Sequence, residues 1–590
     1  MSRLLPHRRF TLRAAACLAL LTLLVPGHAF ALQDPQVSAE QAQAAEQQAR
    51  AALEAGRFQD AYVALRPALE ADPERPDLWF LLGQIVAGMG QPERALQAYD
   101  ASITLGPDVP SPWFSRGVVL LSLGRFEEAQ TSFEKCLELA PEQAPQVALY
   151  LGMARLRNDD AEGALGALEA ADPAAPNYGE VVRFRTEALR TLGRATDAVE
   201  GAAAYLQEHP DYQPVRYEMA LSFIDAGFPE DALKAMRLAA IATPPYPDAV
   251  MEYAAGLRST DVPEDRIEAA GLYRHGLDSF PGNGLMRAEL ASLYVELGME
   301  TEAGVEASRI VETAPNDAES LLMAGNLLLR TRRPQEAFTA LERAGSLEPD
   351  DPLIEEQLGL TLMQLQRFDD ALAAFDHALE LDPELLDSRV AAARAALYLD
   401  QPEKAIELLG DSGPAIEENP EALVALGEAY VEAERFEEAV PPLQRAIDLD
   451  TTLADPLYLL ARAYRGIGRA DMAQSALEEF QARQQQQPAT PAEEGGAEAH
   501  RLEMLQTRAA VYVAEGRFEE ALPVLESAVA EHPDVPELYD LMADAYDGLG
   551  NSARAEEMRQ RAAELRRTPD PAAPNPTSNP RERARHPSTS

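Results

Sequence analysis

Cysteine is almost absent from this chain. It occurs only at Cys17 and Cys136, and Cys17 lies in an N-terminal segment that we interpret below as a removable leader. A single remaining thiol forms no disulfide framework and no cysteine-based metal site. We expect Cys136 to be a packed thiol, because small residues occupy the corresponding positions of neighbouring segments.

Sequence motifs of catalysis are also missing. There is no His-Glu-x-x-His helix, no phosphate-loop lysine motif and no Gly-x-Ser-x-Gly turn. The glutamate pairs at 127–128, 437–438 and 519–520 recur at helix starts, where carboxylates favour the helix dipole. We therefore expect no enzyme, no cofactor and no metal site. The six histidines after the leader are far apart in sequence: His209, His275, His377, His500, His532 and His586.

Basic residues are outnumbered by acidic ones. The chain has 51 Lys and Arg against 98 Asp and Glu, which gives a formal net charge of -47. A chain this acidic repels nucleic acid and anionic lipid, so we expect neither as a main partner. Proteins remain the expected partner class.

Long apolar runs are confined to the N-terminus. Four arginines from Arg3 to Arg13 precede an apolar run at 14–25, and Ala29-Phe30-Ala31 follows. This order is typical of a secretory signal peptide at 1–31, cleaved after Ala31. The run is short for a membrane span, so the sequence predicts a soluble periplasmic or secreted bacterial protein without an integral span after cleavage. The alternative is an uncleaved N-terminal membrane anchor.

A 34-residue period dominates the rest of the chain. Segments resembling Gly124-Arg125-Phe126-Glu127-Glu128-Ala129 recur, and ten of the fourteen intervals between their central alanines are 34 residues. A fixed period of this length marks a stacked-repeat architecture, which favours binding over chemistry. The central alanines are Ala61, Ala95, Ala129, Ala161, Ala198, Ala232, Ala269, Ala303, Ala337, Ala371, Ala405, Ala439, Ala473, Ala521 and Ala555.

Each period contains two amphipathic helices. Around Gly124, apolar or small residues at helical spacing form one stripe before the glycine and one after it. Gly124 suits the left-handed turn that ends a helix, and Gly117 and Ala129 allow the two helices to approach closely. Ser111-Pro112 and Asp455-Pro456 predict helix starts in which the first residue is the N-cap.

These residues resemble the tetratricopeptide repeat (TPR) family. The resemblance covers about 41–566, and it implies an all-α, right-handed α-solenoid (superhelix) of antiparallel helix hairpins. The family's clamp for C-terminal carboxylates needs Lys, Arg and Asn on the first helices. The three lysines here, Lys135, Lys234 and Lys404, all lie on second helices, so we do not expect that clamp in this chain. The closest matches are Trp79, Leu82, Gly83, Gly90, Ala95, Tyr99 and Pro107; Leu423, Leu426, Gly427, Tyr430, Ala439 and Ala446; and Tyr512, Gly516, Ala521 and Pro533.

The repeats fall into two blocks. After a polar lead-in at 32–40, about thirteen repeats occupy 41–483 and a C-terminal pair occupies 500–566. Glutamine, proline and glycine at 484–499 predict a flexible linker between the blocks. The proline- and arginine-rich tail at 567–590 has no apolar periodicity and is predicted to be disordered. Irregular repeats near Arg183, Asp261 and Gly410 predict bends or breaks.

The resemblance also implies where a ligand binds. In the family the first helix of each repeat lines the concave face, and this mapping predicts an apolar groove in repeats two to six. The alternative is that the same side chains pack between neighbouring helices. The groove residues are Phe80, Gln84, Phe114, Val118, Leu149, Met153, Arg183, Tyr217 and Leu221.

The last repeat carries acidic residues on the same face. Asp540, Asp544 and Asp547 have the spacing of one helical stripe. They can hold a cationic segment, including the chain's own arginine-rich tail, or weakly a hard cation. A solvated face that caps the array is the alternative.

Together these features predict a non-enzymatic scaffold of the bacterial cell envelope that binds partner peptides or helices in its groove. The alternative is a glycan- or peptidoglycan-associated component of an export or assembly machine. Glycan sites need aromatic platforms, and the chain has only two tryptophans, Trp79 and Trp113, which argues against this alternative.

Overall fold

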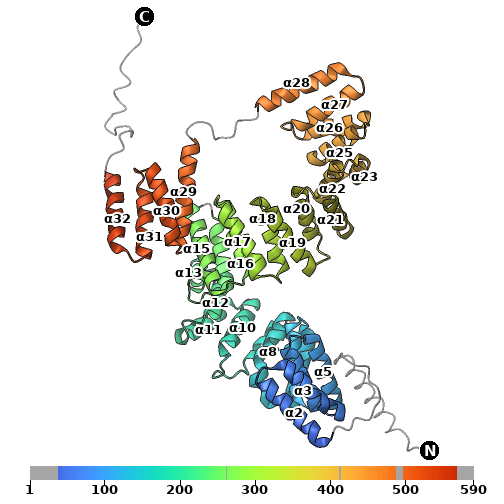
Figure 1. The fold of residues 1–590 in the computed structure, drawn as a ribbon. Coiled ribbons are helices and arrows are strands. Elements are labelled where there is room, and N and C mark those ends of the chain that lie inside the picture. The colour runs from blue at the N-terminus through green and yellow to red at the C-terminus, as the bar shows by residue number, and fades with distance from the viewer. Residues whose placement is uncertain (1–37, 261, 411–413, 487–495, 568–590) are drawn as a thin grey trace, which may run out of the picture. The chain divides into compact units, whose positions relative to one another are not determined.

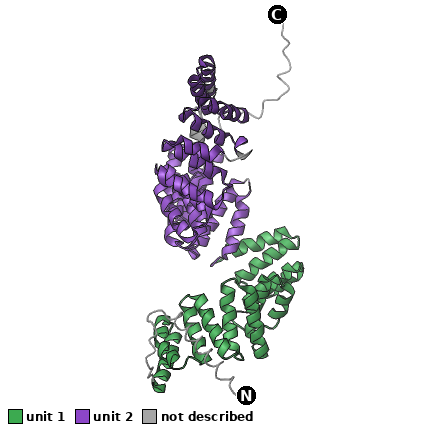
Figure 2. Cartoon of the chain, turned by 90° about the vertical axis from the view of Figure 1, so that its right-hand side faces the viewer, with its two compact units in different colours: residues 1–242 green, residues 243–590 purple. Residues whose placement is uncertain are grey.

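The computed structural model describes residues 38–260, 262–410, 414–486 and 496–567. The chain divides into two compact units, one ending at Ala242 and the other beginning at Thr243 (Figure 2). Helices form both units, and no strand occurs in these described ranges. The fold is therefore the all-α solenoid that the period predicts. The division lies between two helix hairpins, ahead of the irregular turn at Asp261, which is itself outside the described residues.

The described residues of the first unit form six consecutive hairpins. Figure 1 draws them in blue to green. Its helices are α2 (Ala39–Glu54), α3 (Phe58–Ala71), α4 (Pro76–Gly88), α5 (Pro92–Leu105), α6 (Pro110–Ser122), α7 (Phe126–Leu139), the short 3₁₀ helix η1 (Pro141–Gln143), α8 (Ala144–Arg157), α9 (Ala161–Leu168), α10 (Tyr178–Thr191), α11 (Ala195–Glu208), α12 (Gln213–Asp225) and α13 (Pro229–Ala240).

The described residues of the second unit continue the pattern with nine hairpins. Its helices are α14 (Pro247–Arg258), α15 (Pro263–Ser279), α16 (Gly284–Glu296), α17 (Glu300–Thr313), α18 (Ala318–Arg330), α19 (Pro334–Leu347), α20 (Pro352–Gln364), α21 (Phe368–Leu381), α22 (Leu386–Tyr398), α23 (Pro402–Gly410), α24 (Pro414–Glu417), α25 (Pro420–Glu432), α26 (Phe436–Leu449), α27 (Asp455–Gly466), α28 (Ala470–Gln486), α29 (Gly496–Ala514), α30 (Phe518–Glu531), α31 (Pro536–Gly548) and α32 (Ser552–Arg567).

Small residues hold the two helices of each hairpin together. A Cβ at Gly117 in α6 would lie 2.6 Å from the ring of Phe133 in α7, so only glycine allows this approach. At the loop that leads from one hairpin to the next, the indole Nε1 of Trp113 donates to the carbonyl oxygen of Pro107 over 3.1 Å. The expected packing role of Gly117 is confirmed.

The turn between the helices of a hairpin is left-handed. Gly124 has φ 71°, as the sequence predicts. Five repeats place a residue with a side chain in this conformation, which L-residues adopt at a cost of about 1–2 kcal/mol. These residues are Asp159, Arg332, Gln366, Asp400 and Glu434.

The core of each unit consists of apolar clusters that follow one another along the chain. In the first of them Trp79 and Phe133 are fully buried. Cys136 belongs to the same cluster, as expected of a packed thiol, and burial raises its pKa.

Several predicted boundaries differ from the observed ones. Pro110 takes the first turn of α6 and Val109 is its N-cap, so the predicted capping role of Ser111 is wrong. Ala454, not Asp455, is the N-cap of α27. Ser38 caps α2, so this helix begins inside the predicted lead-in at 32–40. Both flanking helices reach into the predicted linker at 484–499, since α28 extends to Gln486 and α29 begins at Gly496, and residues 487–495 lie outside the described ranges.

Candidate functional site: a groove along the first helices

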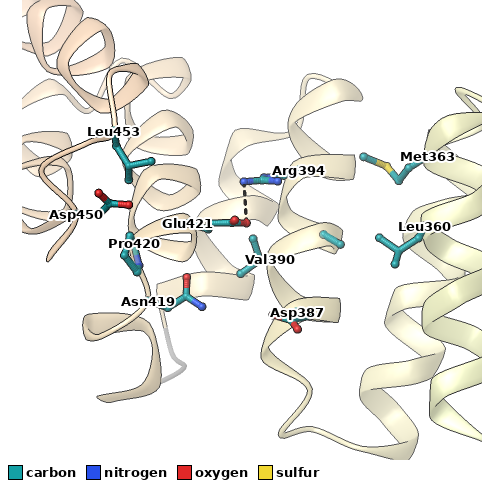
Figure 3. A pocket seen from close by; sticks show the side chains of 11 residues that line it. Leu360, Met363, Asp387, Val390, Arg394, Asn419, Pro420, Glu421, Asp450 and Leu453 are labelled. Carbon is teal, nitrogen blue, oxygen red and sulfur yellow. Dashed lines mark hydrogen bonds and ion pairs between the residues drawn. The ribbon is translucent and has the colours of Figure 1, made fainter. Parts of the chain in front are cut away.

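Two adjoining cavities lie along the first helices of four successive hairpins in the second unit. Their volumes are about 680 and 550 Å³, and Arg394 of α22 lines both. Figure 3 shows the first cavity. We call the two cavities together the first-helix groove. The first cavity is lined by Leu360, Met363, Asp387, Val390, Ala391, Arg394, Asn419, Pro420, Glu421, Asp450 and Leu453. The second is lined by Arg394, Leu397, Tyr398, Val424, Glu428, Glu432, Asp455, Tyr458, Leu459, Arg462 and Phe480.

The repeat period explains why these side chains share one surface. Val390, Val424 and Tyr458 are spaced by 34 residues and occupy the same position on α22, α25 and α27. Arg394, Glu428 and Arg462 follow one helical turn later in each helix. Because each first helix packs its other face against the second helix of its hairpin, equivalent positions line up along the array.

The second helix of the hairpin holds this orientation. At Gly427 in α25 a Cβ would lie 2.4 Å from the side chain of Leu443 in α26. That contact fixes the rotation of α25 about its own axis, and Val424 and Glu428 line the groove beside it.

Acidic groups outnumber basic ones in the groove. Six carboxylates line it against two guanidinium groups. Arg394 lies 3.5 Å from the Glu421 carboxylate, and Arg462 lies 2.8 Å from that of Glu432. Two arginines neutralise only part of this charge, so the groove favours cationic groups on a ligand. The six carboxylates are those of Asp387, Glu421, Glu428, Glu432, Asp450 and Asp455.

Glu428 on α25 occupies the position that Arg394 has on α22 and Arg462 has on α27. Burial raises its pKa, and the neighbouring carboxylate of Glu432 raises it further. Arg394 and Arg462 oppose that shift. A cationic ligand group beside Glu428 would relieve the repulsion between the two carboxylates.

Aromatic and aliphatic side chains supply the remaining lining. Tyr398 is 66% exposed and Tyr458 is 48% exposed. The ring of Tyr458 packs against that of Phe480 in α28, with centroids 5.8 Å apart. Exposed aromatic rings beside carboxylates suit a ligand that combines apolar and cationic side chains, and aromatic residues are the usual anchors of such contacts.

The groove predicted in the first unit has a different environment. Leu149 and Tyr217 are buried, and Phe114 packs edge-on against Tyr150 with centroids 5.3 Å apart. Arg183 pairs with Glu180 and lies over the Phe184 ring. The ligand site there stays a prediction. The remaining predicted residues, Phe80, Gln84, Val118, Met153 and Leu221, are half-buried.

The acidic stripe of the last repeat pairs with arginines of its own hairpin. Asp540 forms an ion pair with Arg566, and Arg559 pairs with Asp547 and lies 3.7 Å from Asp544. Both arginines belong to α32 and precede the tail, which is outside the described residues. Binding of an external cationic segment by this stripe stays a prediction.

Sequence reasoning missed the groove in the second unit although its signal was present. Val390, Val424 and Tyr458 occupy the same position in the repeat as Phe80 and Phe114 of the predicted groove. The choice between repeats depends on which side chains leave open space, and the period does not contain that information.

Neither a metal cluster nor a membrane span is found in the described part of the chain. No group of three or more His, Cys, Asp or Glu there could hold a metal ion. No helix in the described ranges is long and apolar enough to cross a bilayer. The predicted signal peptide at 1–31 and the tail from residue 568 onward lie outside those ranges.

Comparison with protein families supports the repeat assignment. Three models, each described as a tetratricopeptide repeat, match the chain, one at 82–155, one at 46–110 and 390–454, and one at 328–397 and 512–573. Together they span about half of the chain. No curated protein sequence matches it.

Solved structures similar to this chain include several helical repeat proteins. MamA 41-end from Desulfovibrio magneticus RS-1 is 23% identical over 29% of this chain and 97% of that chain, with a TM-score of 0.28. The Cut9–Hcn1 hetero-tetramer of APC/C is 16% identical over 86% and 97%, with a TM-score of 0.33. YrrB, described as a TPR protein with an unusual peptide-binding site, is 19% identical over 31% and 93%, with a TM-score of 0.28.

Proposed function

Because the chain belongs to the tetratricopeptide repeat family, we propose that it is a protein-interaction scaffold whose first-helix groove binds a segment of a partner protein. The observation that supports this most is the pair of adjoining cavities on successive first helices. Cavities repeated at the array's own period suit a linear ligand, whose side chains also recur at intervals.

The lining indicates the chemistry of that segment. Exposed Tyr398 and Tyr458 favour apolar or cationic side chains, and six carboxylates against two arginines favour Lys or Arg. The proposed ligand is therefore a peptide or helix in which basic and apolar residues alternate at short intervals.

The expected site of action is the bacterial cell envelope or exterior. The charged, apolar and small-residue order of 1–31 supports export. N-terminal sequencing of the protein purified from its native cells tests this, with Leu32 expected as the first residue. Recovery of chains that begin at Met1 from envelope fractions would contradict cleavage.

Peptide arrays test the binding proposal. Arrays of 15-residue peptides with mixed basic and apolar residues are compared with arrays in which the basic residues are replaced by Glu. We expect retention of the basic set and a steep loss with added salt, since charge attraction between exposed groups is screened. Equal retention of the two sets would contradict the proposed ligand chemistry.

A charge reversal locates the binding. Glu421 lines the groove and its side chain is 72% exposed, so Glu421→Lys disturbs no core packing. We expect it to weaken basic-peptide binding about tenfold, equivalent to about 1.4 kcal/mol. Glu437→Lys on α26 is the matched control, because Glu437 is exposed and does not line the groove. Equal weakening by both variants would place the binding elsewhere.

The predicted groove of the first unit is tested in the same assay. Phe114→Ala removes a half-buried ring without changing charge. If this variant alone loses peptide binding, the first unit carries the ligand site.

A further inference from the structure

Helix α29 of the C-terminal repeat pair packs against α15, although more than 200 residues separate them (Figure 1). The backbones touch: a Cβ at Gly271 in α15 would lie 2.7 Å from the carbonyl oxygen of Ala514. A contact between backbones at a glycine requires close and well-defined docking.

A buried network of charges and phenols joins the two surfaces. Tyr294 of α16 donates a hydrogen bond to Glu515, and Tyr512 of α29 donates to Glu302 of α17. Arg508 of α29 forms an ion pair with the same Glu302. The side chains of Glu515 and Glu302 are 0% and 9% exposed, so both carboxylates are removed from water by the contact.

The charges around Glu515 are balanced from both sides. Arg517 of the C-terminal pair lies 3.0 Å from its carboxylate, and Arg274 of α15 lies 3.9 Å away. Arg274 also pairs with Glu306 over 2.9 Å. A buried carboxylate is tolerated only when such partners are in place, so the two surfaces are matched to each other.

Glu515 is unusual for its position in the repeat. It precedes the left-handed turn residue Gly516, and fourteen turns in the described ranges have such a residue. Most of the preceding residues are apolar, as Leu123 and Leu297 are, and Glu515 is the only charged one. A single charge at an otherwise uncharged position, buried against another hairpin, indicates a role specific to this contact.

We propose that the surface formed by α15, α16 and α17 is a binding site for the C-terminal repeat pair of the same chain, so that docking in cis brings together repeats that precede and follow residues 318–486. The repeats at 318–486 follow α17 in the chain and precede α29, and they carry the first-helix groove. The docking is independent of which ligand the groove binds. Its polar character is typical of contacts between parts that can separate.

Two glycine variants of the full chain test the docking. Gly271→Ala places a methyl group against the Ala514 carbonyl, whereas Gly256→Ala in α14 meets no atom within 4 Å. Both changes put alanine in a helix, so they share the same effect on helix propensity. We expect Gly271→Ala to raise hydrogen exchange at least tenfold in peptides covering 294–302 and 508–517, and to increase the radius of gyration. Gly256→Ala should change neither.

A charge exchange separates opening from misfolding. Glu302→Arg and Arg508→Glu should each raise exchange in the same peptides, and the double variant should restore protection, because the ion pair is re-formed with reversed polarity. Restoration requires that the two residues meet in solution. Unchanged exchange in Gly271→Ala and in both single variants would overturn the proposal.

The molecular mass distinguishes docking within one chain from docking between two. Light scattering should give the mass of one chain for the wild type and for Gly271→Ala. A wild-type dimer that becomes a monomer in Gly271→Ala would contradict docking in cis and assign the surface to a second copy.

Discussion

The phenol of Tyr294 donates a hydrogen bond to the carboxylate of Glu515, 221 residues further along the chain. Tyr294 is fully buried and the Glu515 side chain is fully shielded from solvent. Burial raises the pKa of both groups, and the hydrogen bond and arginines around Glu515 oppose the shift of its carboxyl. This relationship makes the second unit more than a linear stack, because it joins hairpins that are not neighbours in sequence.

Removing the Tyr294 hydroxyl should loosen that junction. Tyr294→Phe keeps the ring but leaves a buried carboxylate oxygen without its donor, which costs about 1–3 kcal/mol. We expect faster hydrogen exchange around 512–517 without loss of helix content by circular dichroism. Tyr398→Phe is the control, since Tyr398 is 66% exposed. Equal exchange in the two variants would show that the hydrogen bond contributes nothing.

Stability of the first unit should depend on pH through Glu218. Burial raises its pKa to about 7, the Glu187 carboxylate adds to the shift, and the nearest guanidinium groups, those of Arg183 and Arg190, are 3.8 and 3.9 Å away. One carboxylate oxygen of Glu218 also lacks a hydrogen-bond partner. Because the folded pKa exceeds the unfolded one, the folded state holds the proton more tightly. The proton on Glu218 therefore stabilises the folded state fully at low pH, and this contribution is lost as pH rises towards 7 and above.

Glu218→Gln removes this titration. We expect the variant to gain about 1–3 kcal/mol over the wild type at pH 8 and much less at pH 4.5, since an amide carries no charge at either pH. Urea unfolding of both proteins at the two pH values measures the difference. A difference that does not change with pH would show that Glu218 is not the titrating group.

Closing the space at Gly117 should destabilise the third hairpin. A methyl group there meets the Phe133 ring at 2.6 Å, and overpacking a core contact costs about 1–3 kcal/mol. Gly166→Ala in α9 is the matched control, because its Cβ meets nothing within 4 Å. Thermal unfolding should therefore begin at a lower temperature in Gly117→Ala and at the same or a higher one in Gly166→Ala.

Glycine at one of the five strained turns should stabilise the array. Gln366 has φ 59°, a conformation that costs a residue with a side chain about 1–2 kcal/mol. Gln366→Gly removes that strain. Glycine also gives the unfolded chain more conformational freedom, which reduces stability by about 0.4–1 kcal/mol. We expect a small net gain in urea unfolding. Gly124→Ala, which introduces the same strain at φ 71°, should lose stability.

Local features of the hairpin were predictable because they depend on residues close in sequence. The left-handed turn at Gly124 and the close approach at Gly117 follow from the absence of a side chain. The N-cap of α6 was misassigned, because Pro110 is an equally good first-turn residue and starts the helix earlier. The left-handed turns without glycine were not predictable, since packing of the two flanking helices holds Gln366 in its strained conformation.

The sequence by itself determined the architecture: a 34-residue period specifies which residues of each hairpin face the core, and that choice is repeated along the chain. Only the tertiary structure decided where open space remains, and it places cavities beside Arg394 and Tyr458. The contact of Tyr294 with Glu515 was also decided there. A period specifies only how each repeat packs against the next one. The donors of a buried carboxylate such as Glu515 come from residues far apart in sequence, which only the folded chain brings together.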